Sequence, residues 1–433
     1  MRVLILTWAC DLEDISEPEI SARWVREISK DHEVTVIAVS KPSRYGCVRR
    51  QFPHLEVIEW KDIWMPASLD RFRAIVKPGY VPYYFKARRF LKRFLKQRQF
   101  DVIHHLSPFA WRYPSPAVGL GVPVVRGPVA GGLKTPVSLL SETKGRALPF
   151  MFLRGTDQWR MKWDPILRSS YRETEHLLMA APYMRDFLSA LPLGSNSIEI
   201  EHGISELPKK ISRGGISQTG EVIRLLYVGR VIPTKGLRLA IRALGQTKTL
   251  PCLSFTVVGD GEDLSSCRAE VERLHLQDRV RFLGWCPKAE VQEHYNNADI
   301  LVFPSFREPT GGVLLEAMAH GVAIVTCAHG GPDYMVSDEC GIKVQPSSEE
   351  RFVADIAGAI DRLASDGQLR CRMGAAATAR AEEHFGWAAK RQRISALYAK
   401  FADRVTASEN EGYDPNNDIL ASEREISPVE SRP

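Results

Sequence analysis

The chain has 433 residues, more than a single hydrophobic core usually holds, so we expect two domains of roughly 200 residues each. Hydrophobic residues make up 44% and charged residues 25% of the chain, as in ordinary globular proteins, and no apolar run reaches the ~18 residues needed to span a bilayer. The net charge of +6 is too small and too dispersed to indicate a nucleic-acid-binding protein.

The first half opens with a strand, a helix and a second strand. Arg2–Thr7 is a short apolar strand, Pro18–Lys30 carries apolar residues four apart, and Glu33–Val39 is again apolar. A helical crossover between two strands predicts a parallel, doubly wound sheet. The turn at residues 8–14 holds no Gly-x-Gly-x-x-Gly, which argues against a dehydrogenase-like dinucleotide site.

The segment Tyr80–Arg98 combines an apolar stripe with basic residues and contains no acid. The spacing predicts a helix with Phe90, Leu91, Phe94 and Leu95 on one face. Such a helix either packs its apolar stripe on the sheet and leaves the cations in water, which we favour, or rests on an anionic membrane with Tyr83, Tyr84 and Phe85 among the headgroups.

Two further strands of the first half end in residues suited to a site. Asp101–Leu106 is a strand that carries His104 and His105, and because neighbouring side chains alternate, at most one of them faces a cleft at the carboxyl end. A lone histidine is more often structural than catalytic. The strand Val122–Val125 leads into the turn at 126–132, whose glycines either admit a ligand or simply turn the chain.

The boundary between the halves lies after residue 205. Helical patterns dominate Ile166–Leu191, and Ser197–Glu201 is expected to be the last strand of the first domain. Glu206–Glu221 is polar and lacks apolar periodicity, which is typical of a linker.

The second half begins with the strand Val222–Val228, a turn at 229–236 and an amphipathic helix. The turn contains Gly229, Arg230 and Lys235. Two cations at the positive end of a helix dipole are unfavourable unless an anion such as a diphosphate lies between them. We therefore prefer an anion site to a merely solvated pair of side chains.

Three more strands of the second half end in turns. Phe255–Val258 is followed by Gly259 and Gly261, Val280–Leu283 is followed by Trp285, and Asp299–Phe303 leads into a loop and a helix. The carboxyl ends of parallel strands share one edge, where ligands bind. We expect a nucleotide to lie along that edge.

The loop after Phe303 carries two carboxylates and two glycines. Glu308 lies in the loop and Glu316 lies in the second turn of the helix that follows, with Gly311 and Gly312 at the helix start and Val313 next to them. Carboxylates accept hydrogen bonds from sugar hydroxyls, and free helix amides bind phosphate. The alternative is an ordinary helix start with helix-favouring glutamates.

The remaining features concern the end of the chain and the cysteines. Helical patterns run from Glu349 to about Phe401, and we expect residues 406–433 to be a disordered tail.

The eight cysteines form no Cys-x-x-Cys pair and no zinc-spaced cluster, which favours a reducing compartment and predicts no metal site. We expect a cytoplasmic protein, located either in the cytosol or at the inner face of the plasma membrane.

Taken together, these motifs resemble a retaining glycosyltransferase of family four, with the GT-B architecture of two Rossmann-like doubly wound domains facing a central cleft. The motifs that carry the resemblance are Tyr227-Val228-Gly229-Arg230 with Pro233 and Lys235-Gly236, the Glu308/Glu316 pair, Glu316-Ala317-Met318-Ala319-His320-Gly321, and Gly330-Gly331-Pro332. His202-Gly203-Ile204 stands where the family has its Asn-Gly-hydrophobic motif. Two departures are Ala9–Glu19 in place of a Gly-Gly loop and His104-His105-Leu106 in place of His-x-His.

The resemblance implies a role for each site residue. It assigns Arg230 and Lys235 to the donor diphosphate, Glu316 to the ribose hydroxyls, and Glu308 with the Gly311 and Gly312 amides to the sugar and phosphate. It further places Gly229, Gly259, Gly261, Trp285 and Val313 in the donor site and either His104 or His105 among the catalytic residues. No Asp-x-Asp occurs in the chain, and no cofactor or metal is expected beyond the nucleotide sugar.

The sequence thus predicts a hexosyltransferase-type enzyme that moves a sugar from a UDP- or GDP-linked donor to a saccharide or polyprenyl-linked acceptor in surface polysaccharide or glycolipid biosynthesis. The alternatives are a sugar-nucleotide epimerase or phosphorylase of the same fold, and a non-catalytic sugar-nucleotide-binding protein. The expected units are an acceptor-binding domain at 1–205, a linker at 206–221, a nucleotide-sugar domain at 222–385, a helix at 386–405 that returns to the first domain, and the tail.

Overall fold

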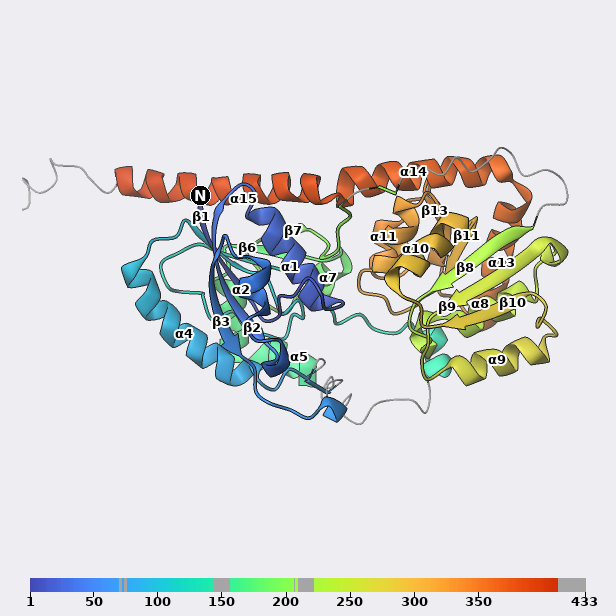
Figure 1. Ribbon diagram of the computed structural model, residues 1–433, viewed down its shortest axis with the longest axis horizontal. Coiled ribbons are helices and arrows are strands. Elements are labelled where there is room, and N and C mark those ends of the chain that lie inside the picture. Colours follow the sequence, from blue (N-terminus) through green and yellow to red (C-terminus); the bar gives the residue numbers. More distant parts are fainter. Residues whose placement is uncertain (70–71, 74–75, 144–155, 206, 209–221, 412–433) are drawn as a thin grey trace, which may run out of the picture.

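The computed structural model describes residues 1–69, 72–73, 76–143, 156–205, 207–208 and 222–411. It contains two α/β domains that lie beside one another, each built on one parallel sheet (Figure 1). The expectation of two doubly wound, parallel-sheet domains is confirmed. Most of the linker predicted at 206–221, and the tail from residue 412 on, fall outside the described residues.

The N-terminal domain has a seven-stranded sheet in the order β3-β2-β1-β4-β5-β6-β7. Its strands are β1 (Arg2–Thr7), β2 (Glu33–Ser40), β3 (Glu56–Lys61), β4 (Val102–His105), β5 (Val124–Val129), β6 (His176–Met179) and β7 (Ser195–Ile198). Its helices are α1 (Glu17–Ile28), α2 (Cys47–Gln51), α4 (Tyr80–Gln97), α5 (Asp157–Trp163), α6 (Pro165–Arg172) and α7 (Tyr183–Phe187). The central strands are buried on both faces, which is why their sequences are almost continuously apolar.

Strand β6 interrupts a region where the sequence indicated helices throughout. Its four residues, His176–Met179, are all buried between β5 and β7. Four residues are too few to show a hydrophobic periodicity that distinguishes a strand from a helix. From the sequence, this segment therefore takes the helical pattern of its neighbours. The last strand is also shifted, because β7 ends at Ile198 and not at Glu201.

Helix α4 packs its apolar stripe on the sheet, the alternative that we favoured from the sequence. Leu91 is completely buried and belongs to the core formed with β1 and β4, and Tyr83 is 5% exposed. Tyr83 therefore cannot lie among lipid headgroups, which was one part of the hypothesis that this helix rests on a membrane. Val81 and Phe85 are exposed at the first turns of α4, at 64% and 59%.

The C-terminal domain has a six-stranded parallel sheet in the order β10-β9-β8-β11-β12-β13. Its strands are β8 (Ile223–Val228), β9 (Leu253–Val258), β10 (Val280–Gly284), β11 (Ile300–Phe303), β12 (Ala323–Cys327) and β13 (Gly341–Val344). Its helices are α8 (Leu237–Leu244), α9 (Leu264–Arg273), α10 (Lys288–Asn297), α11 (Gly312–Ala319), α12 (Gly331–Met335), α13 (Glu349–Ser365) and α14 (Gly367–Phe385). The carboxyl ends of β8, β9, β10 and β11 therefore meet at one edge of the sheet.

The chain returns to the first domain through α15 (Trp387–Glu411), which follows α14 along one side of the molecule (Figure 1). Trp387, Ile394 and Tyr398 are buried in the N-terminal core against α1 and β4. The helix continues to Glu411, six residues beyond the expected boundary at 405.

The two points at which the chain passes between the domains are hydrogen-bonded to each other. The Ile204 amide donates to the Phe385 carbonyl at 3.1 Å, and the Trp387 amide donates to the Ile204 carbonyl at 2.9 Å. Gly203 leaves room for the Trp387 ring, since a Cβ there would lie 2.6 Å from it. These paired crossings form a compact hinge.

A segment of the N-terminal domain also packs into the C-terminal domain. Leu139, in the 3₁₀ segment η3 (Val137–Thr143), is fully buried in the core of the second domain. Glu142 forms ion pairs with Arg238 and Arg242 at 2.7 and 3.2 Å. The Ser138 hydroxyl donates to the Pro346 carbonyl at 2.7 Å.

Across the described part of the chain, the structure offers no helix that combines the length and the apolar character needed to cross a bilayer.

Candidate functional site

The centre of the candidate site is an ion pair between Lys235 and Glu308. Lys235 closes the turn after β8, in the 3₁₀ segment η5 (Pro233–Lys235), and Glu308 lies in the loop after β11, the neighbouring strand. Their side chains are 13% and 12% exposed, and the Lys235 ammonium also lies 5.6 Å above the Phe303 ring. The cation is therefore held at the carboxyl edge of the sheet by a carboxylate and an aromatic ring.

Helix α11 begins beside this pair, since a Cβ on Gly311 would lie 3.3 Å from Glu308 Cγ. Gly311 adopts a φ of +102° just before the helix, a backbone conformation that favours glycine. Gly312 and Val313 form the first turn, so their amides have no partner within the helix. Glu308, Lys235 and a positive helix end thus lie together, an arrangement suited to an anion that also carries hydroxyl groups.

The glycines of the neighbouring turns allow close backbone packing. A Cβ on Gly259 would lie 1.9 Å from the Gly229 carbonyl oxygen, and a Cβ on Gly261 would lie 2.2 Å from the Val231 carbonyl oxygen. All three glycines have positive φ. The turns after β8 and β9 therefore pack directly on each other, which by itself accounts for their glycines.

Glu316 lies deeper in the site, near Tyr295 of α10. Burial raises the pKa of the Glu316 carboxyl, while a hydrogen bond with Tyr295 and the nearby Lys288 and His202 act in the opposite direction. The Tyr295 hydroxyl also donates to the Val313 carbonyl at 3.2 Å. A poorly solvated carboxylate of this kind gains from any hydroxyl donor that a ligand brings.

Arg230 and Trp285 lie at the outer part of the same edge. Arg230 is exposed, its carbonyl accepts a hydrogen bond from the Tyr227 hydroxyl at 3.1 Å, and no described residue forms an ion pair with its guanidinium. The Trp285 side chain is 78% exposed after β10. Both side chains are therefore available to a ligand, whereas Lys235 already has a partner.

Both ring nitrogens of His104, one of the two candidate catalytic histidines, are engaged by groups in the interior of the protein. His104 is completely buried, with Nδ1 2.5 Å from the Tyr398 hydroxyl and Nε2 2.7 Å from the Gly127 carbonyl. The carbonyl can only accept, so Nε2 carries the proton and Nδ1 accepts from Tyr398. Burial lowers the pKa of His104 to about 4.

His105 faces the opposite side of β4, as strand alternation requires, and it is also buried. Its Nε2 lies 3.4 Å from the Tyr80 hydroxyl, and burial together with Arg126 holds its pKa well below the usual range. Neither histidine of the pair is exposed to the space between the domains.

The segment that joins the domains supplies side chains that the sequence did not identify. The Glu201 carboxylate accepts a hydrogen bond from the Thr310 hydroxyl at 2.7 Å, across the domain boundary. His202 lies beside the start of α11, since a Cβ on Gly312 would come within 3.0 Å of its ring. Lys288 of α10 pairs with Glu19 of α1 at 3.0 Å. The motif His202-Gly203-Ile204 signalled the domain end but not these contacts.

Within the part of the chain that the structure describes, no group of three or more His, Cys, Asp or Glu side chains is placed to hold a metal ion.

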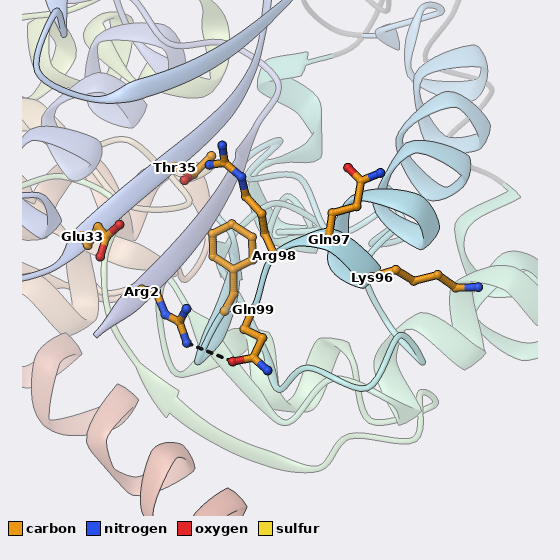
Figure 2. Close-up of a pocket in the computed structure, with 8 residues that line it drawn as sticks. Arg2, Glu33, Thr35, Lys96, Gln97, Arg98 and Gln99 are labelled. Atoms are coloured by element: carbon orange, nitrogen blue, oxygen red, sulfur yellow. Dashed lines mark hydrogen bonds between the residues drawn. The ribbon is translucent and has the colours of Figure 1, made fainter.

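A groove of about 460 Å³ lies at the opposite edge of the N-terminal sheet (Figure 2). Arg2 and Glu33, which line it, are the first residues of β1 and β2, so the groove lies far along the strands from their carboxyl ends. Arg2 bonds Gln99 and Arg98 pairs with Glu56, while the Lys96 side chain is directed away from the other lining residues (Figure 2). The groove therefore does not compete with the Lys235 site as a functional centre.

Comparison with known proteins places the second half of the chain among glycosyltransferase sequences. Residues 210–380 match the family model described as glycosyl transferases group 1. The lipopolysaccharide core biosynthesis glycosyltransferase LpsE of Rhizobium meliloti is 29% identical over 164 residues, covering 38% of this chain and 46% of that protein. The D-inositol 3-phosphate glycosyltransferase of Corynebacterium glutamicum is 32% identical over 180 residues, covering 40% and 42%. The chain spans about half the length of the curated relatives it matches.

Solved structures resemble the whole fold. Sucrose-phosphate synthase from Thermosynechococcus elongatus has a TM-score of 0.62 at 19% identity and covers 92% of this chain and 98% of its own. HepE from Anabaena in complex with UDP has a TM-score of 0.59 at 18% identity, and the match covers 92% of this chain and 100% of the HepE chain. These likenesses confirm the GT-B fold that the sequence motifs predicted.

Proposed function

We propose that this chain, which has the GT-B fold and matches the group 1 glycosyltransferase model over residues 210–380, transfers a sugar from a nucleoside diphosphate sugar to a saccharide or lipid-linked acceptor, with retention at the anomeric carbon. The donor binds the C-terminal domain, and the acceptor enters from the N-terminal domain. The pathway is the synthesis of surface polysaccharide or glycolipid.

The observation that carries the proposal is the Lys235–Glu308 pair in front of the first turn of α11. When a nucleoside diphosphate leaves the sugar, negative charge builds on its β-phosphate. A fixed ammonium and free helix amides stabilise that charge without reorganising, and this is the largest single contribution in many enzymes. Arg230, which is exposed and forms no ion pair with a described residue, supplies a second cation to the diphosphate.

The remaining donor contacts follow from the geometry of the edge. Glu316 accepts from the ribose hydroxyls, and Glu308 accepts from the sugar hydroxyls while keeping Lys235 in place. Three solved neighbours are complexes of HepE with UDP, with UDP and glucose, and with UDP-glucose, so uridine nucleotides are the first donors to test on this chain. GDP-linked sugars are the second set.

The test is turnover of UDP-glucose and other nucleotide sugars with a mixture of saccharide and polyprenyl-linked acceptors. A transferase forms a new glycoside only when acceptor is present and otherwise hydrolyses the donor slowly. An epimerase converts the donor alone, a phosphorylase requires phosphate, and a binding protein retains the donor unchanged.

Contact with a membrane is a separate part of the proposal. Val81 and Phe85 are exposed at the amino end of α4, and the outward face of that helix carries lysines and arginines with no acid among its residues. Exposed apolar residues beside cations are suited to an anionic lipid surface. A lipid-linked acceptor would then be presented close to the N-terminal domain.

A further inference from the structure

The donor site includes a loop that touches the other domain. Residues 304–311 connect β11 to α11, and the second half of this loop, Glu308 to Gly311, sets both the Lys235–Glu308 pair and the free amides at the start of α11. The loop is therefore the element that must be held still if charge is to be stabilised at one fixed point.

Two of the contacts that hold this loop come from its own domain. The Gly331 amide donates to the Glu308 carbonyl at 2.9 Å. A Cβ on Gly331 would lie 2.4 Å from the Thr310 Cα, so the loop rests directly on the backbone of α12.

A third contact comes from the N-terminal domain. The Thr310 hydroxyl donates to Glu201 Oε1 at 2.7 Å, with Thr310 4% and Glu201 7% exposed. The second carboxylate oxygen, Glu201 Oε2, is buried and has no hydrogen-bond partner in the structure. A buried hydrogen bond to a carboxylate is stronger than one between neutral groups, and losing its donor leaves the carboxylate still less satisfied.

The position of Glu201 in the chain connects this contact to the hinge. Glu201 lies three residues before Ile204, whose backbone pairs with Phe385 and Trp387 at the domain crossing. The Trp24 ring nitrogen donates to the Glu201 carbonyl at 2.9 Å and fixes its backbone from α1. His202 adds a contact with Gly312 on the other side of the same loop.

We propose that Glu201 is a positioning residue for the donor site: through the hydrogen bond from Thr310 it ties the catalytic loop of the C-terminal domain to the hinge segment of the N-terminal domain. This inference rests on the proposed function for its effect on donor turnover, but its structural part does not. The loop amides of Gly311 and Gly312 keep their orientation because the hinge holds Thr310.

The test uses four variants in the full-length protein. Thr310→Val and Glu201→Ala each remove the hydrogen bond, whereas Thr310→Ser and Glu201→Gln each retain a hydroxyl donor and an oxygen acceptor. Ser138→Ala is the matched control, because Ser138 also makes a hydrogen bond across the domain boundary, to the Pro346 carbonyl and not to a residue of the loop.

The first readout is hydrogen exchange, without ligand, of the Leu314, Leu315 and Gly331 amides, which donate to the loop carbonyls of Gly311 and Glu308 and therefore report whether the loop is held. We expect faster exchange there in Thr310→Val and Glu201→Ala, by about five- to thirty-fold as for the loss of one buried hydrogen bond, and wild-type exchange in the Ser, Gln and Ser138→Ala variants. Equal exchange in all variants would overturn the inference, whatever the protein catalyses. Thr310→Val keeps the test decisive if Glu201→Ala fails to fold.

The second readout is the hydrolysis of UDP-glucose and, once an acceptor is found, its glycosylation. The positioning role is supported if Thr310→Val and Glu201→Ala show both faster loop exchange and a lower kcat. Thr310→Ser should restore both the exchange rate and kcat to the wild-type values. Faster loop exchange with an unchanged kcat would overturn it. If the wild-type protein turns over no nucleotide sugar, the proposed function fails, and the exchange data still decide whether Glu201 holds the loop.

Discussion

Lys235 and Glu308 form an ion pair although 73 positions of the chain separate them. The turn after β8 and the loop after β11 meet because these two strands are neighbours in the sheet. Both side chains are largely withdrawn from water, so their attraction is only weakly screened by salt. A diphosphate that enters the site therefore meets a lysine already fixed in position.

Replacing Lys235 by Ala should lower kcat by about 10²-fold or more and weaken binding of the donor, because it removes a preorganised cation and leaves Glu308 unpaired. Steady-state kinetics with the best nucleotide sugar measures both effects. The control is Lys248→Ala, an exposed lysine beyond the far end of α8. Wild-type kinetics in Lys235→Ala would remove the diphosphate role of this residue.

Glu316 should make nucleotide affinity depend on pH. Burial raises the pKa of its carboxyl, so the group becomes protonated at a higher pH than an ordinary glutamate. A protonated carboxyl is a poorer acceptor for ribose hydroxyls, and affinity for UDP should fall as the pH drops through this raised pKa. Calorimetry on wild type and Glu316→Gln separates this effect from the titration of UDP itself. The same pH dependence in both proteins would contradict the assignment.

His104 should affect stability in acid and not catalysis. Its pKa is about 4 in the fold and about 6.5 in the unfolded chain, so protonation of the unfolded state lowers stability progressively between these values. Above pH 6.5 His104 is neutral in both states and does not lower the free energy of unfolding. Below pH 4 the protonation of His104 has lowered the free energy of unfolding by about 3 kcal/mol. Denaturant unfolding at several pH values measures the free energy of unfolding of wild type and of His104→Asn. As the pH falls, this free energy should decrease less in the variant than in wild type. A large fall in kcat at pH 7.5 without unfolding would restore His104 as a catalytic candidate.

The exposed end of α4 should bind anionic lipid. The double variant Val81→Glu with Phe85→Glu should no longer sediment with vesicles that contain phosphatidylglycerol, since it places acids where apolar side chains meet the membrane. Val222→Glu, the same replacement of an exposed valine in the other domain, should sediment like wild type. Wild-type protein that stays in solution at low salt would exclude this surface as a membrane contact.

Local patterns predicted which turns of the C-terminal domain lie together at one edge of its sheet. The turns after β8, β9, β10 and β11 follow from apolar runs that end in Gly or Pro, and a parallel sheet necessarily brings such ends to one edge. That argument places Lys235 and Glu308 together without any knowledge of side-chain packing. It does not reveal that Lys235 is paired while Arg230 is open to solvent.

Contacts between distant segments were beyond the sequence argument. The surroundings of His104 depend on Tyr398, which lies 294 residues later on a helix that returns from the other domain. Leu139 belongs to the first half of the chain but is buried in the core of the C-terminal domain. Its local sequence pattern does not show which of the two domain cores will bury it. Glu201 likewise acquires its partner Thr310 only when both domains are in place.

The most direct measurement is a crystal structure of the protein with UDP bound. The account predicts a diphosphate whose β-phosphate oxygens lie about 3 Å from Lys235 Nζ and from the Gly311 or Gly312 amide, with the ribose hydroxyls on Glu316. A diphosphate that touches neither Lys235 nor the first turn of α11 would contradict it.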